Sequence, residues 1–517
     1  MSEFKNLRDF SISFDADSSV SVLVGRNGAG KSNILEALTL IFRDLDLGQV
    51  ASLSFKIRYQ CRGHEVVVVG TSGERTYAVT VDGAAVSASR LLGESGRDLR
   101  PDFVFGYYSG PSNRFEQHFT QHQERFYRDL VSGIENPLRP LFYARAVHSN
   151  FVLLAFFLEN DSEVRNLLRD HLGIESLDSV LFEMQKPTWK SSNGDPRFWN
   201  AQGTVRTFLD GLYRLALAPM RMDSRIKVGT RRPTKNEHLY LFLPGLSEVQ
   251  QLRSAYRSNQ EFFKALESTY ISELIYDVRI RVSLKKVGAP LTFRELSEGE
   301  QQLLLVLGLM RFTREDESLF LLDEPDTHLN PAWSAQYRRF LERFGGLGPT
   351  SHVLMATHDP LVVSALKREE VRILERGTDG LIHPIEPLED PQGMGVGNLL
   401  TSDVYGLKAQ VDIETLEKIQ LKRSLAARND LSADEESKLA GLAEELRHLG
   451  LLTEDRDPDF QEYLKVKYAE REVQAPKAEP RTQADIQAER ALAERIFSEV
   501  VAKRGQVEAE NGEDDLG

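Results

Sequence analysis

The sequence has a single cysteine, Cys61, among its 517 residues. One thiol excludes a disulfide within the chain and any zinc site built from cysteines, and it fits a reducing compartment. Long apolar runs are also missing: the longest, residues 151–158, is too short to span a bilayer. The N-terminal residues lack the basic segment and apolar core of a secretory signal. We therefore expect a cytoplasmic protein with no membrane contact.

An excess of basic residues is missing as well. The chain carries 64 Lys and Arg against 78 Asp and Glu, which gives a formal charge of −14. A protein that bound nucleic acid over its whole surface would lean basic, so DNA would have to bind at a local patch or through a partner. Residues 221–235 hold a basic cluster, which fits either a DNA-phosphate patch or an exposed loop with balancing acids.

The clearest motif is GRNGAGKS at residues 25–32, between a predicted strand (19–24) and a predicted helix. This is the G-x-x-x-x-G-K-S phosphate-binding loop in the strand–loop–helix context that it requires. Its backbone N–H groups would wrap the phosphates, Lys31 would reach the β- and γ-phosphates, and the Ser32 hydroxyl would bind Mg²⁺. The predicted nucleotide contacts are Gly25, Arg26, Asn27, Gly28, Ala29, Gly30, Lys31, Ser32 and Asn33.

Two further sequence motifs lie close together, near residue 300. Ser297 and Glu300 have the spacing of a capping box, so a helix should begin there and point free N–H groups out of a polar loop, which suits a phosphate. Residues 319–322 are apolar and predict a buried parallel strand that ends in Asp323 and Glu324. Open α/β sheets bind ligands at that end of their strands. Asp323 is therefore placed to hold a metal, and Glu324 to take a proton from water.

A third predicted strand, residues 351–357, ends at His358, which we interpret as a γ-phosphate contact. Residues 55–80 predict an antiparallel β-subdomain and residues 103–108 another strand. Gln117 follows that strand as a candidate nucleotide sensor, although it equally fits a solvated helix position.

The order of these motifs resembles that of the ABC-type ATPases, in the soluble branch that includes RecF, SMC-type and OLD-type proteins. The LSEGEQQ and DEPDTHLNP segments carry the resemblance, which covers about residues 1–115 and 275–380. It implies an α/β fold: a P-loop ATPase head with a mixed central sheet, helices on both faces and an antiparallel β-subdomain. The expected parts are head residues 1–115, a mainly helical insertion at 116–274, head residues 275–380, a helical C-terminal region at 381–472 and a disordered acidic tail at 473–517.

The resemblance also implies roles for the residues and a dimer. ATP and Mg²⁺ would be the cofactors, with Ser32 and Asp323 as metal ligands and Glu324 and His358 as catalytic residues. The signature residues Ser297, Glu298 and Gly299 would contact the nucleotide on another subunit. That arrangement predicts a homodimer, or a higher even oligomer, with ATP sandwiched between heads.

The segments after the head resemble those of the PtuA-type ATPases of Septu anti-phage systems, a type that also accompanies some retrons. This more distant resemblance implies a slow, regulatory ATPase that controls a separate HNH-type nuclease docked on the C-terminal region, with DNA bound directly or through the partner. Residues 458–465 have the wrong spacing for a PD-(D/E)xK nuclease. The alternatives are a RecF/SMC-like repair ATPase that clamps DNA and the nucleotide-binding subunit of a transporter.

Overall fold

The computed structural model divides the chain into two units, residues 1–386 and 387–517. It describes residues 1–134, 139–159, 161–226, 234–285, 291–312, 317–345, 347–348, 350–428, 430–449, 482–484, 486–488 and 490–498. Among these residues no helix is both long and apolar enough to cross a membrane. The segment that superficially resembles a nuclease motif, 458–465, lies outside the described residues.

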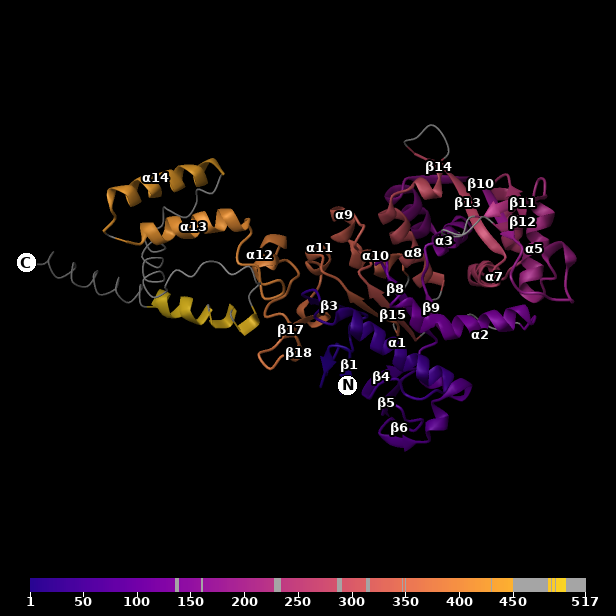
Figure 1. The fold of residues 1–517 in the computed structure, drawn as a ribbon, viewed down its shortest axis with the longest axis horizontal. Coiled ribbons are helices and arrows are strands. Elements are labelled where there is room, and N and C mark those ends of the chain that lie inside the picture. Colours follow the sequence, from indigo (N-terminus) through magenta and orange to yellow (C-terminus); the bar gives the residue numbers. More distant parts are fainter. Residues whose placement is uncertain are drawn as a thin grey trace, which may run out of the picture. The chain divides into compact units, whose positions relative to one another are not determined.

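A seven-stranded sheet forms the centre of the first unit (Figure 1). Its order is β18-β17-β3-β16-β15-β8-β9, and every neighbouring pair is parallel except β17 and β18. The sheet is therefore mixed, as expected for an ABC-type head. The strands are β3 (Val20–Gly25), β8 (Phe103–Tyr108), β9 (Leu141–Tyr143), β15 (Ser318–Asp323), β16 (His352–Ala356), β17 (Val371–Arg376) and β18 (Ile382–Ile385).

The central strands form because their residues are apolar on both faces. In β3, five consecutive residues are buried, and β15 is buried over nearly its whole length, which is the pattern of a covered parallel sheet. Helices that belong to this head are α1 (Lys31–Leu47), α8 (Glu298–Phe312), α9 (Pro331–Ser334), α10 (Tyr337–Arg343) and α11 (Pro360–Val363), with the short turns η6 (Phe293–Glu295) and η7 (Arg368–Glu370).

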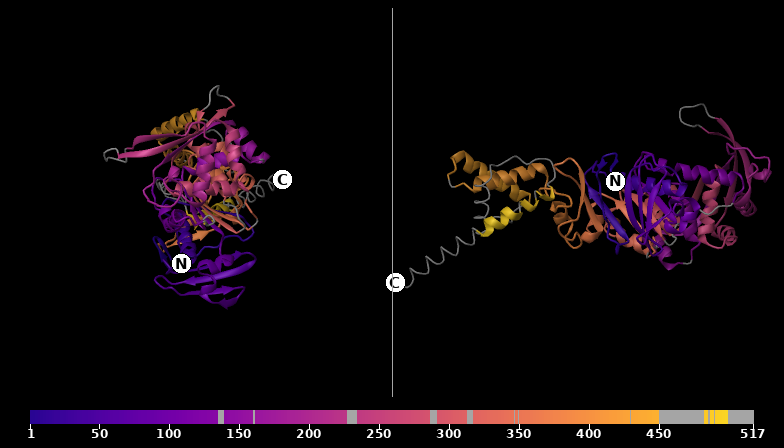
Figure 2. Two further views of the ribbon diagram at one scale, coloured as in Figure 1. Left: turned by 90° about the vertical axis from the view of Figure 1, so that its right-hand side faces the viewer. Right: turned by 90° about the horizontal axis from the view of Figure 1, so that it is seen from below.

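A separate four-stranded antiparallel sheet confirms the predicted β-subdomain and forms the lower lobe in the left view of Figure 2. Its buried face shares one hydrophobic core with helix α1: Phe55, Val66 and Val68 pack in the same cluster as Leu35 and Phe42. The subdomain therefore supports the helix that follows the phosphate-binding loop. Its strands are β4 (Phe55–Cys61), β5 (His64–Gly70), β6 (Tyr77–Val81) and β7 (Ala84–Val86), preceded by β1 (Glu3–Phe4) and β2 (Leu7–Arg8) and followed by η1 (Ala88–Arg90) and η2 (Gly93–Leu99).

The prediction of a mainly helical insertion missed strands β10, β11 and β12, which join β13 and β14 in a five-stranded antiparallel sheet of order β11-β12-β10-β13-β14. Its central strand, β10 (Ile174–Gln185), pairs with β13 through three register shifts. These irregularities break the two-residue alternation by which a strand is recognised in sequence. The other strands are β11 (Met220–Ile226), β12 (Thr234–Leu243), β13 (Ile275–Leu284) and β14 (Leu291–Thr292).

Helices make up much of the insertion. The apolar run at 151–158 lies almost entirely in α3 (His148–Phe157), and a separate helix, α4 (Ser162–Asn166), follows because Asp161 caps it by accepting from the N–H of Glu163. The remaining elements are η3 (Glu116–Phe119), α2 (Thr120–Val131), η4 (Leu167–His171), η5 (Pro196–Phe198), α5 (Gly203–Leu215), α6 (Leu246–Ser254) and α7 (Asn259–Ile271).

The basic cluster at 221–235 falls on β11, on β12 and on residues outside the described part of the chain. Arg221 pairs with Glu237 across these strands. This pair neutralises one cation of the cluster, which favours the exposed segment with balancing acids over a phosphate patch at that position.

The second unit contains α12 (Val396–Thr401), α13 (Ile413–Ala426) and α14 (Ala433–His448). Ser432 and Glu435 form a capping box at the start of α14. The unit begins after β18, so the head extends past the predicted limit at residue 380. The tail predicted to be disordered, 473–517, lies mostly outside the described residues, but 490–498 are helical and Ile496 is fully buried.

A buried ion cluster ties the insertion to the head. Glu267 of α7 accepts from His148 of α3 at 2.8 Å and forms an ion pair with Arg139, before β9, also at 2.8 Å. All three side chains are almost completely buried. Burial raises the pKa of Glu267, but the charges of His148 and Arg139 outweigh burial and lower it to about 2.

Replacing Glu267 with Gln leaves Arg139 buried without its counter-charge. We expect the free energy of unfolding at neutral pH to fall by about 3 to 5 kcal/mol. This loss should become smaller as the pH falls from the ordinary glutamate pKa toward about 2, because wild-type Glu267 loses its own contribution to stability over that range. Urea unfolding between neutral and acidic pH measures the difference. The control is Glu342→Gln, which breaks an exposed pair with Arg338 and should cost less than about 1 kcal/mol. Equal effects of the two substitutions would contradict the cluster's role.

Candidate functional site

The phosphate-binding loop joins β3 to α1, and its glycines are required by shape. Gly30 has φ 94° and ends the loop where the helix begins at Lys31. Gly25 has φ 152°, and a Cβ there would lie 2.7 Å from the carbonyl oxygen of Leu374 on β17. A side chain fits neither position without strain. The loop therefore brings its backbone close to β17 and presents the first turn of α1 at the sheet edge.

Lys31 lies inside this loop and is 7% exposed. Its ammonium donates a hydrogen bond to the carbonyl of Gly25 at 2.7 Å. Burial lowers the pKa of Lys31, and the nearby carboxylates of Glu324 and Asp323 act in the opposite direction. The lysine thus spans the concave side of its own loop, the side on which a phosphate would be wrapped.

Asn6, which was not predicted from the sequence, braces the loop from outside. Its amide donates to the carbonyl of Gly28 at 2.6 Å and accepts from the Asn33 amide at 2.6 Å. Asn6 lies between β1 and β2, so it belongs to no motif and nothing in its local spacing indicates this role. Asn33 donates that second bond through its amide, and its contact with the nucleotide stays a prediction.

Asp323 ends β15 level with the last residues of β8 and β16 and two residues before the end of β3. The register aligns it with Tyr108 of β8 and Ala356 of β16, and Ala356 in turn with Leu23 of β3. The side chain of Asp323 is almost completely buried, and burial raises its pKa to about 6, although a hydrogen bond with Ser32 and the charge of Arg114 oppose the rise. The two predicted metal ligands, Asp323 and Ser32, therefore meet.

Arg114 is the residue that sequence reasoning missed at this position. One of its guanidinium nitrogens lies 2.7 Å from the Ser32 hydroxyl oxygen and 3.3 Å from a carboxylate oxygen of Asp323. The candidate sensor Gln117 contacts this arginine rather than the motifs: its amide donates to the Arg114 carbonyl at 2.7 Å. Arg114 follows β8 without a recognisable spacing, so only the fold reveals it.

Glu324 has a left-handed backbone, with φ 54°. Such a conformation costs a non-glycine residue about 1 kcal/mol or more and is enriched at functional sites. Its N–H donates to the Ala356 carbonyl at 2.8 Å, and its carboxylate lies 3.5 Å from Nδ1 of His358. The turn points the Glu324 side chain, which is one-third exposed, toward His358 at the end of the neighbouring strand.

Asp326 fixes the relative position of the two strand ends. The hydroxyl of Thr357, the residue before His358, donates to the Asp326 carboxylate at 2.5 Å and accepts from the N–H of Asp359 at 2.9 Å. Asp326 is almost completely buried, and burial raises its pKa to about 6 despite the bond from Thr357. The turn after β15 is thus locked to the turn after β16.

The signature segment begins α8 as predicted. Ser297 and Glu300 form the capping box: the Glu300 carboxylate accepts from the N–H and the hydroxyl of Ser297, each at 2.8 Å. Ser297 and Glu298 are exposed. In the next turn of the helix, the amide of Gln302 donates to the Glu324 carbonyl at 3.5 Å, which links the signature helix to the strained turn.

Gly299 is buried because the turn after β15 lies directly against it. A Cβ at this position would lie 2.3 Å from the carbonyl oxygen of His328. The His328 ring also lies 3.5 Å from the carboxylate of Glu298. The helix start and the His328 turn are therefore in van der Waals contact, which only glycine permits.

The residues present fit a magnesium ion bound together with a nucleotide. Mg²⁺ is usually held by one or two protein oxygens, with phosphates and water completing its shell. Ser32 and Asp323 supply two such oxygens, and they already bind a cationic group. The described residues contain no cluster of three or more Asp, Glu, His or Cys side chains that would hold a metal without a nucleotide.

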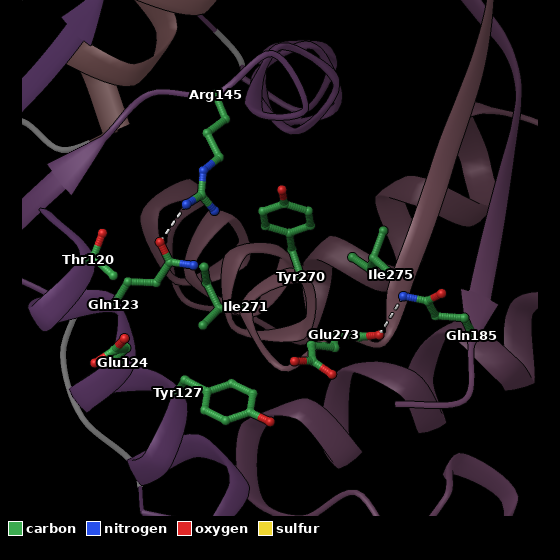
Figure 3. A pocket seen from close by; sticks show the side chains of 10 residues that line it. All are labelled: Thr120, Gln123, Glu124, Tyr127, Arg145, Gln185, Tyr270, Ile271, Glu273 and Ile275. Carbon is green, nitrogen blue, oxygen red and sulfur yellow. Dashed lines mark hydrogen bonds between the residues drawn. The ribbon is translucent and has the colours of Figure 1, made fainter. Parts of the chain in front are cut away.

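A cavity of about 510 Å³ lies in the insertion (Figure 3). Arg145, Tyr127 and Tyr270 line it, and Arg145 also contacts Glu116 of η3, two residues after Arg114. None of the predicted site residues lines this cavity, so it is separate from the motifs at the sheet edge.

Gly299→Ala would force a methyl group against the His328 carbonyl. We expect the free energy of unfolding of the head to fall by about 1 to 3 kcal/mol, which lowers Tm by several degrees. Gly441→Ala is the matched control, because Gly441 lies inside α14 with no atom within 4 Å of the point where a Cβ would lie, and alanine favours a helix. Differential scanning calorimetry measures both. An unchanged head transition in Gly299→Ala would contradict the close contact.

Two family models match parts of the chain. One, described as "AAA domain, putative AbiEii toxin, Type IV TA system", matches residues 226–364, and another, "AAA ATPase domain", matches residues 2–70. The two matches lie on either side of the insertion's first part and include the phosphate-binding loop, the signature segment and the two strand ends.

Among curated proteins, the Septu protein PtuA of Bacillus mycoides (strain KBAB4) is 27% identical over 179 residues. The alignment covers 32% of this chain and 24% of that protein, so it spans well under half of the relative.

Two solved structures are similar to this chain, although their TM-scores over the whole chain are low. The SMC head domain from Thermotoga maritima has a TM-score of 0.30 and 14% identity, covering 74% of this chain and 96% of that one. Stu0660 of Streptococcus thermophilus has a TM-score of 0.25 and 10% identity, covering 92% and 94%.

The mixed sheet with its antiparallel subdomain, the order of the motifs along it and the two family matches agree with one another. The family they indicate implies nucleotide binding with Mg²⁺. The chain therefore carries an ABC-type ATPase head of the AAA kind, similar to PtuA.

Proposed function

We propose that the head binds ATP with Mg²⁺ and hydrolyses it, with the residues predicted from sequence in the predicted roles. The observation that carries this proposal is the meeting of Lys31, Ser32, Asp323 and Glu324 at one edge of the central sheet. The loop would wrap the phosphates and Lys31 would exchange its bond to the Gly25 carbonyl for the β- and γ-phosphates. Ser32 and Asp323 would hold the metal, which supplies charge neutralisation when bound.

Glu324 is the proposed acceptor of the proton from the attacking water. Its carboxylate is partly exposed, and its backbone position is fixed by the N–H bond to Ala356 and by Gln302. His358 lies beside it and is the proposed γ-phosphate contact. Their separation of 3.5 Å leaves both side chains available to a water and a phosphate rather than committed to a short bond with each other.

The signature residues act on another copy of the chain in this proposal. Ser297 and Glu298 are exposed at the start of a 15-residue helix, whose free N–H groups carry partial positive charge. A second head that presents its bound nucleotide to this helix start would complete both sites. We therefore propose a homodimer, or a higher even oligomer, held together by ATP.

At the level of the cell, we propose a regulatory subunit of an anti-phage complex that controls a separate HNH-type nuclease. The similarity to PtuA supports this. The second unit offers a surface for such a partner, since Leu407, Ile413 and Leu449 are large apolar side chains that are more than one-third exposed. Docking over residues 381–472 and a slow turnover that serves regulation remain part of the proposal.

Lys31→Ala and Glu324→Gln should separate binding from turnover. Without the ammonium we expect nucleotide affinity to fall by about 100-fold or more, whereas Glu324→Gln should retain affinity and lose about 100-fold or more in kcat. Fluorescent-nucleotide binding and phosphate release measure the two quantities, with Glu342→Gln as the surface control. The mass of the Glu324→Gln variant, measured by light scattering, should double when ATP is added. Equal affinity of Lys31→Ala and wild type would contradict the site, and a constant mass would contradict the dimer.

The partner is tested by purifying the tagged chain from its native host and identifying what accompanies it by mass spectrometry. We expect a stoichiometric nuclease subunit that is retained by Lys31→Ala and lost when residues 387–517 are removed. Recovery of the chain with DNA alone, together with DNA-stimulated hydrolysis, would instead indicate a RecF/SMC-like ATPase that clamps DNA. Recovery with membrane proteins would indicate a transporter subunit.

A further inference from the structure

Arg114 occupies the place where the metal would bind. The same guanidinium nitrogen contacts both predicted metal ligands, at 2.7 Å from the Ser32 hydroxyl and 3.3 Å from the Asp323 carboxylate. A magnesium ion binds its oxygen ligands at about 2.1 Å. The arginine nitrogen therefore takes the contacts to both oxygens that such an ion would make, and its positive charge would repel a cation placed beside it.

Arg114 satisfies the electrostatic demand of Asp323 in the absence of the ion. The carboxylate is almost completely buried, and an isolated buried charge is costly unless a cation faces it. Lys31 lies near but donates its short bond to the Gly25 carbonyl, so Arg114 makes the direct contact. The arginine is held there on its other side by the ring of Tyr108, 4.9 Å from the ring centre.

The position of Arg114 is also one that it can leave. The side chain is 42% exposed, so a path to solvent is open. Its Nε atom is buried and has no hydrogen-bond partner, an arrangement that lowers the cost of leaving this position. Arg114 therefore neutralises the charge of Asp323, but its own hydrogen bonds are incomplete, so another cation can replace it.

We propose that Arg114 is a built-in counter-cation, which holds the metal position while the head is free of Mg²⁺ and which the magnesium–nucleotide complex must displace. This inference rests on the proposed nucleotide site. It assigns Arg114 a specific effect: it makes nucleotide binding less dependent on Mg²⁺, because the arginine already supplies one positive charge beside Asp323 when the ion is missing.

Displacement of Arg114 would also affect contacts in the insertion. The carbonyl of Arg114 accepts from Gln117, and Glu116 of the same turn pairs with Arg145 at 2.6 Å. Arg145 lines the cavity shown in Figure 3 together with Tyr270 of α7. A movement of the Arg114 backbone would change these contacts directly, without passing through the signature helix.

The test compares nucleotide affinity with and without the metal. The full-length wild type and Arg114→Ala are titrated with a non-hydrolysable ATP analogue by calorimetry, once in saturating Mg²⁺ and once in EDTA. The quantity of interest is the ratio of Kd in EDTA to Kd in Mg²⁺. We expect this ratio to rise about tenfold in Arg114→Ala, because affinity in EDTA falls when Asp323 faces the phosphates alone, while affinity in Mg²⁺ is kept or improved.

Arg114→Gln, which keeps much of the length of the side chain without its charge, should repeat this result if the alanine variant folds poorly. Arg114→Lys should restore part of the wild-type ratio. Arg128→Ala, at an exposed position of α2, is the control and should leave the ratio unchanged.

Two outcomes would overturn the proposal. A loss of affinity that is equal in Mg²⁺ and in EDTA would make Arg114 an ordinary phosphate ligand, and an unchanged affinity in both would make it a structural residue. Failure of the wild type to bind the analogue under either condition would instead refute the nucleotide site itself, so the two failures are distinguishable.

Discussion

The contact between a buried carboxylate and a cation at the end of β15 is the constraint on which the rest of the site depends. Asp323 is buried because its strand is central, with β16 on one side and β8 on the other. Burial alone would favour the protonated acid, and the surrounding groups oppose this. Ser32, Arg114 and Lys31 all gather around this one side chain, and the carboxylate thereby determines where the phosphate-binding loop and the segment after β8 meet.

The sequence predicts those parts of the site whose residues lie within one short segment of the chain. The loop at 25–32, the strand that ends in Asp323 and Glu324, and the capped helix at Ser297 each carry their signal within a dozen residues, and parallel strands in register bring the parts to one edge. Arg114 and Asn6 carry no such signal. The side chain of Arg114 contacts residues 82 and 209 positions away in the sequence, and that of Asn6 contacts residues 22 and 27 positions away. The central strand of the insertion sheet, β10, was missed for a related reason, since it is irregular and is stabilised by partners distant in sequence.

Contacts within one chain connect the start of the signature helix α8, which a neighbouring subunit would contact, with the residues that would contact the nucleotide. Gln302 joins the signature helix to the carbonyl of Glu324, and the carbonyl of His328 lies against Gly299. Asp326 then ties the same turn to Thr357, beside His358. A group that pressed on the start of α8 would therefore reach both predicted catalytic residues through direct contacts, and the left-handed backbone of Glu324 lies in the middle of this path.

Several functional groups of the head are paired with one another in this structure. Lys31 is bound to the Gly25 carbonyl, the hydroxyl of Ser297 to Glu300, and the oxygens of Ser32 and Asp323 to Arg114. Binding of a nucleotide would thus exchange one set of contacts for another instead of filling unpaired positions, and such an exchange yields a small net free energy from large opposing terms. Two states of a protein that differ by a few kcal/mol are the ones that a ligand can interconvert.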